Sequence, residues 1–92
     1  MNKYLIKEHK RNLGVQKIYH FPNGYGASVV RNPFSYGGEM GLWEIAVLDE
    51  YDNLTYETPI TDDVIGYLND DEVIEVLNKI KELEKWKNIK WL

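Results

Sequence analysis

Strand-forming residues are concentrated in four short segments of the first two thirds of the chain. Segments 15–21 and 25–31 read as two strands, and Pro22-Asn23-Gly24 between them predicts a tight hairpin turn, because Asn-Gly readily adopts positive φ angles. Segment 42–48 is apolar on both faces, which indicates a central strand, and 54–57 predicts a fourth strand after an acidic turn. We therefore expect a four-stranded antiparallel meander, preceded by a short irregular arm or edge segment over 1–14.

The pattern changes to helical signals after residue 57. Thr61, followed by Asp62 and Asp63, predicts the N-terminus of a short helix over 62–68. Asn69 with Glu72 three residues later predicts a capping box at the start of a longer helix. The apolar stripe of this helix consists of Val73, Val76, Leu77, Ile80 and Leu83. The expected fold class is α+β: the meander, then a short and a longer C-terminal helix packed on one sheet face.

Length and composition limit the class of protein. The chain has 92 residues, which we expect to form one domain over 1–92, since a second core would not fit. Its apolar fraction of 43% is typical of a globular fold. The absence of cysteine excludes disulfides, thiolate zinc sites and cysteine nucleophiles. No apolar run approaches the roughly 20 residues of a membrane span, and no signal peptide is evident, so we expect a cytoplasmic protein without membrane contact.

The charge is unevenly distributed. Residues 1–20 hold five Lys or Arg against one Glu, whereas residues 21–80 hold two basic against twelve acidic residues. One interpretation is that the basic termini fold back on the acidic body. The other is that the acidic region faces a basic partner, with imitation of DNA as its extreme form. Because the body is acidic, nucleic acid is not an expected partner.

No catalytic motif is recognisable. The two histidines, His9 and His20, stand eleven residues apart, a spacing that matches no metal or catalytic motif. The acidic segment 49–53 lacks the central glycine and distal glutamate of a calcium loop. The glycine clusters lack the Gly-Lys-Ser/Thr context of a phosphate loop. We therefore expect no enzyme activity, no catalytic residues, no metal and no cofactor.

Aromatic residues provide the candidate site. A sheet covered by helices on one side leaves some aromatics on the other side, and exposed aromatics beside an arginine are typical of protein interfaces. The predicted partner-binding surface is the sheet face together with the loop over 33–41. Its five residues are Tyr25, Arg31, Tyr36, Trp43 and Tyr56. The alternative is that these side chains complete the core or a dimer contact, so a homo-oligomer stays open.

Three ordered segments, NGYGASVV (23–30), WEIAVL (43–48) and YETPITDDVIGYL (56–68), are similar to a family of small proteins of tailed bacteriophages and prophages. The resemblance implies no active-site residues. It implies an accessory protein in the bacterial host cytoplasm that binds a host or anti-phage defence protein and modulates it. Capture of a signal nucleotide, or inhibition as an acidic DNA mimic, are the alternatives.

Overall fold

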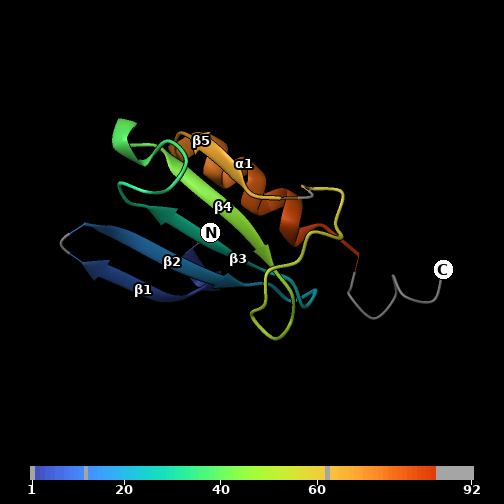
Figure 1. Ribbon diagram of the computed structural model, residues 1–92. Coiled ribbons are helices and arrows are strands. Elements are labelled where there is room, and N and C mark those ends of the chain that lie inside the picture. The colour runs from blue at the N-terminus through green and yellow to red at the C-terminus, as the bar shows by residue number, and fades with distance from the viewer. Residues whose placement is uncertain (1, 12, 62, 85–92) are drawn as a thin grey trace.

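The computed structural model describes residues 2–11, 13–61 and 63–84 as one antiparallel sheet with a helix on one face (Figure 1). Its five strands follow one another in chain order. They are β1 (Leu5–Arg11), β2 (Gly14–His20), β3 (Gly26–Arg31), β4 (Trp43–Leu48) and β5 (Ile65–Leu68). Helix α1 covers Asp70–Lys81, and two short 3-10 helices cover Asn2–Tyr4 and Gly38–Met40. The α+β class is confirmed, but the sheet has five strands and one α-helix follows it in the described residues.

Of the two expectations for 1–14, an irregular arm or an edge segment, the structure agrees with the second, because Leu5–Arg11 forms the edge strand β1. Glu8 pairs with Lys17 and His9 with Gln16, so β1 forms a hairpin with β2, and the register shifts by one residue between Leu5 and Lys7. The alternation of apolar and polar residues is absent because β1 is an edge strand that is largely exposed to solvent. Charged side chains are common on such edges, since they discourage pairing with further strands.

The short helix predicted over 62–68 is wrong in its described part, where the chain forms β5; Asp62 lies outside the described residues. In place of the predicted strand over 54–57, the structure has a single antiparallel bridge between Leu54 and Leu48. β5 then resumes pairing with β4 through Ile65 and Ile45. The expected fourth strand and β5 are thus two parts of one interrupted edge beside β4, and this long-range pairing overrides the local helical signal.

The hairpin of β2 and β3 and the longer helix are confirmed, but the connection covers residues 21–25, and of the Asn-Gly pair only Gly24 has a positive φ. Gly24 has a φ of 93° in the turn between β2 and β3, a backbone conformation that glycine adopts without strain. The Asn69 side chain accepts a hydrogen bond from the Glu72 amide, and the Glu72 carboxylate accepts one from the Asn69 amide, which completes the predicted capping box. No helix in the described part of the chain has the length and apolar character needed to cross a membrane.

The core lies between α1 and strands β3, β4 and β5, so β1 and most of β2 project beyond the helix (Figure 1). We call this side of the sheet the helix-covered face and the other the open face. The fully buried side chains of the core include Val29, Ile45, Val47, Leu77 and Ile80. On the open face the strands carry a mixture of polar and small apolar side chains, such as Gln16, which donates a hydrogen bond to Ser28.

Candidate functional site

The five predicted site residues do not lie on one surface. Tyr25, at 1% exposure, is part of the core, and burial together with the nearby Glu57 carboxylate raises its pKa above the usual 10.0. Trp43 is also buried and lies on the helix-covered face. Tyr36 and Tyr56 are exposed, but in two different loops. A surface on the open face built from all five residues is therefore wrong.

Arg31 and Trp43 are the two members of the predicted set that the structure brings together. The Arg31 guanidinium carbon lies 4.2 Å from the centre of the indole ring, within the range of a cation–π contact. Tyr36 belongs to the β3–β4 loop, which starts directly after Arg31. The loop over 33–41, which is one of the two parts of the predicted surface, therefore lies at the end of the sheet where β3 ends.

The β3–β4 loop is ordered by its own hydrogen bonds. The Asn32 side chain accepts bonds from the amides of Phe34 (2.7 Å) and Ser35 (2.9 Å). The Ser35 hydroxyl accepts a bond from the Asn32 amide at 3.0 Å and donates one to the Asn32 carbonyl at 2.9 Å. The Gly37 carbonyl accepts bonds from Met40 and Leu42, which closes the second half of the loop. The connection over residues 32–42 is thereby held in a defined shape.

Two further bonds attach this loop to the sheet. The Tyr36 amide donates to the Glu44 carboxylate at 2.9 Å, and the Tyr36 carbonyl accepts a bond from the Tyr67 amide at 3.1 Å. The contact with β5 is so close that a Cβ atom on Gly66 would lie 2.3 Å from the Tyr36 Cβ. Glycine at this position is therefore what permits the loop to lie against β5.

Large apolar side chains are exposed on this ordered loop. Phe34 is 90% exposed and Met40 is 70% exposed. Leu13, in the neighbouring β1–β2 turn, is 67% exposed. Figure 1 shows this turn and the β3–β4 loop at the same end of the sheet. Exposed apolar side chains that gather in one place are a feature of interaction sites, whereas scattered ones are ordinary.

A cleft separates the turn from the loop; we call it the end cleft. It consists of two hollows of about 490 and 520 Å³ that share Leu13, Gly14, Val15 and Asn32. The first hollow reaches Phe34 and His9 on the open face. The second lies on the helix-covered face and touches Lys10, Arg31, Pro33 and Glu39. The end cleft therefore continues around the end of the sheet: apolar residues line it where the hollows meet, and basic groups outnumber acidic ones in the hollow on the helix-covered face.

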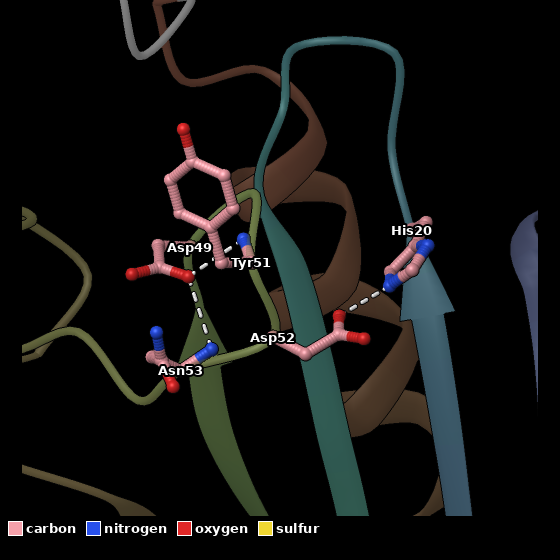
Figure 2. A network of polar contacts seen from close by, with 5 residues as sticks. All are labelled: His20, Asp49, Tyr51, Asp52 and Asn53. Carbon is pink, nitrogen blue, oxygen red and sulfur yellow. Dashed lines mark hydrogen bonds and ion pairs between the residues drawn. The ribbon is translucent and has the colours of Figure 1, made fainter.

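The acidic segment 49–53 has a local structural role (Figure 2). The Asp49 carboxylate accepts hydrogen bonds from the amides of Tyr51 (2.8 Å) and Asn53 (3.0 Å), and the Asp52 carboxylate contacts the imidazole of His20 at the end of β2. Within residues 2–11, 13–61 and 63–84, no three His, Asp or Glu side chains gather as a metal site would require. These contacts account for His20 and for the acidic turn without a ligand.

Charge compensation between the basic N-terminus and the acidic body is limited. Apart from the contact between His20 and Asp52, the ion pair found in the described part of the chain is local to β1: Lys10 lies 3.6 Å from Glu8. In the described residues no ion pair joins the basic hairpin of β1 and β2 to the acidic start of α1 at Asp70. The self-complementary interpretation of the charge pattern therefore has no support from ion pairs in these residues.

Leu13 was not part of the predicted surface, and Phe34 and Met40 were included through the loop over 33–41 but were not among its five named residues. The segment that contains Leu13 reads as an arm, so its position beside the β3–β4 loop is not predictable without the pairing of β1 with β2. Phe34 and Met40 lie within the predicted loop, and three glycines with Asn32, Pro33 and Ser35 around them were a usable sign of an ordered turn. The side chain of an apolar residue in such a turn is expected to be exposed, because the turn lies away from the core.

Comparison with known proteins identifies no relative. No protein-family model matches this chain, and neither a curated protein nor a solved structure matches it. The resemblance to small phage proteins therefore stays a prediction.

Proposed function

We propose that this chain is a non-catalytic protein-binding domain that holds a segment of a partner protein in the end cleft. The observation that carries the proposal is Phe34, which is 90% exposed on a loop fixed by internal hydrogen bonds. Folding gains little from a phenylalanine in this position. Transfer of such a side chain into a partner's pocket contributes roughly 1.5–3 kcal/mol to binding.

The order of the loop supports the same proposal. A flexible segment loses conformational freedom when it binds, which reduces affinity, whereas a rigid one has lost it during folding. Asn32 and Ser35 hold the loop at both ends of its first turn, and Glu44 attaches it to β4. Phe34 is thus presented in a defined position, as in the anchors of tight protein interfaces.

The lining of the end cleft defines the chemistry of the partner. Leu13, Val15 and Phe34 favour an apolar side chain, and Lys10 and Arg31 at the rim favour a neighbouring carboxylate. We therefore propose a partner segment that carries an apolar anchor flanked by Asp or Glu. The resemblance to small phage proteins is the reason to propose, in addition, that the partner is a host or anti-phage defence protein in the bacterial cytoplasm.

The test compares partner capture by three immobilised proteins: the unchanged chain, a Leu13→Ser/Phe34→Ser variant and a Tyr51→Ser control. Tyr51 is 75% exposed in the turn at the other end of β4, so the control removes a comparable exposed side chain. We expect one bacterial protein to be retained by the unchanged chain and the control but not by the cleft variant. Calorimetry with the purified partner should then show a dissociation constant raised about tenfold or more by Phe34→Ser alone.

Two outcomes would contradict the proposal. Equal capture by the cleft variant and the control would place the partner elsewhere on the surface. Sedimentation showing that the unchanged chain is a dimer, and that Leu13→Ser/Phe34→Ser is a monomer, would assign the end cleft to a second copy of this chain instead. Circular dichroism of each variant verifies that the fold is retained.

A further inference from the structure

A second site lies on the helix-covered face, where two cations meet one indole ring. The Lys17 ammonium lies 5.1 Å from the centre of the Trp43 ring, and the Arg31 guanidinium carbon lies 4.2 Å from it. Lys17 pairs with Val29 across β2 and β3, and Arg31 pairs with Val15, so the two cations are diagonal neighbours on adjacent strands. Side chains of this length reach one another from such positions.

Neither cation has an ion pair with a carboxylate in the part of the chain that the structure describes. The acid-rich composition, with 15 Asp and Glu against 11 Lys and Arg, makes this arrangement unexpected. Besides the indole, Arg31 contacts the Gly41 carbonyl through a long bond of 3.4 Å. Two like charges on neighbouring strands repel each other, and an anion between them would remove this repulsion.

A groove opens beside these cations. It has a volume of about 470 Å³, in the range of small-molecule sites, and is bounded by Lys17, Arg31, Trp43 and Asp70 with apolar walls that include Val29 and Ile74. The Asp70 carboxylate accepts a hydrogen bond of 2.9 Å from the indole nitrogen through one oxygen. Its second oxygen is available to accept a bond from a ligand.

We propose that this groove binds a small organic phosphate at a site that shares Arg31 with the end cleft and otherwise has its own residues. The guanidinium fork and the ammonium match the charge and the several oxygens of a phosphate group better than those of a single carboxylate. Asp70 repels a bare phosphate but accepts a bond from a hydroxyl or amino group attached to it. The apolar walls at Val29 and Ile74 then cover the carbon part of the ligand.

Isothermal titration calorimetry with four probes tests this assignment: inorganic phosphate, ribose 5-phosphate, AMP and adenosine. We expect the two organic phosphates to bind more tightly than inorganic phosphate, because only they offer Asp70 a donor. Adenosine should not bind measurably, because it lacks the phosphate. If ribose 5-phosphate and AMP have equal dissociation constants, the base makes no contact and the ligand is a sugar phosphate. A lower dissociation constant for AMP would identify the ligand as a nucleotide.

Charge-matched variants locate the site. Lys17→Gln and Arg31→Gln should each weaken binding about tenfold or more, as expected for loss of a charge-assisted bond. Lys7→Gln, which removes the same charge from the open face of β1, should leave it unchanged. In a Trp86→Phe/Trp91→Phe background Trp43 is the sole tryptophan, and its emission should change with each bound phosphate.

The proposal is overturned if no probe binds with a dissociation constant below about 10 mM at low salt, or if Lys7→Gln weakens binding as much as Lys17→Gln. The second result would mean general attraction to a basic surface. The Leu13→Ser/Phe34→Ser variant should bind the organic phosphates as the unchanged chain does, which separates this site from the end cleft. Lys17 is partly exposed, so Lys17→Gln keeps the test decisive if Arg31→Gln does not fold.

Discussion

Replacement of Asn23 should reveal how the β2–β3 turn holds the helix in place. The Asn23 amide nitrogen lies 2.8, 3.0 and 3.0 Å from the carbonyl oxygens of Ile80, Lys81 and Leu83. Its side-chain oxygen accepts a bond from the Tyr25 amide at 3.0 Å. The side chain thus joins the C-terminal end of α1 to the turn, and with 9% exposure it does so largely away from water.

The magnitude follows from counting these bonds. The amide group has two hydrogens, so it forms two good bonds with the three carbonyls at a time, and the Tyr25 contact is a third. At roughly 1 kcal/mol net for each bond, with an additional cost for buried partners left without one, Asn23→Ala should lower the free energy of unfolding by about 2–4 kcal/mol. For a domain of this size the midpoint temperature should fall by at least about 8 °C.

Asn23→Asp should add a pH dependence that the alanine variant lacks. A carboxylate at this position would face helix carbonyls and the negative end of the helix dipole, so its pKa in the folded state is raised above the value of about 3.9 in the unfolded chain. The protonated acid can still donate one bond. The stability of this variant should therefore be highest below about pH 4 relative to Asn23→Ala and should decrease as the pH rises through the folded-state pKa.

Urea unfolding followed by circular dichroism measures these differences at several pH values. Asn53→Ala is the matched control: Asn53 is an exposed turn residue whose side chain makes no hydrogen bond in the described residues, so the change should stay within about 0.5 kcal/mol. If Asn23→Ala also stays within that limit, the capping argument is wrong. The same holds if Asn23→Asp and Asn23→Ala show parallel pH profiles.

Two further changes test other contacts of the fold. Gly66→Ala should destabilise the protein by about 1–3 kcal/mol, because the added Cβ would lie 2.3 Å from the Tyr36 Cβ and force the β3–β4 loop away from β5. Urea unfolding measures this loss, and an unchanged midpoint would refute the close approach. Burial raises the pKa of Tyr19, with a smaller contribution from Glu8, and also that of Tyr25. Because these phenols ionise more readily in the unfolded chain, the free energy of unfolding should decrease as the pH rises above about 10. Tyr19→Phe should reduce the slope of this free energy against pH, and an equal slope in the two proteins would contradict this reasoning.

Local sequence signals were sufficient where neighbouring residues decide the structure. Gly24 supplies the positive φ of the hairpin turn, and Asn69 with Glu72 supplies both halves of the capping box at the start of α1. The apolar runs of β2, β3 and β4 were recognisable because these interior strands carry β-branched and aromatic residues. Turn and cap chemistry depends on residues one to three positions apart, which is why it can be predicted from the chain alone.

Tertiary structure decided whatever depends on pairing between distant segments. β1 has the polar composition of an arm and becomes a strand because β2 pairs with it, whereas the segment around Ile65 has a helix-start signal but pairs with Ile45 on β4. The same pairing determines which side chains are exposed: Tyr25 enters the core, while Phe34 and Leu13 lie together at one end of the sheet. The aromatic content of the chain indicated a binding surface, but its position depends on contacts between strands, because these bring together the β1–β2 turn and the β3–β4 loop.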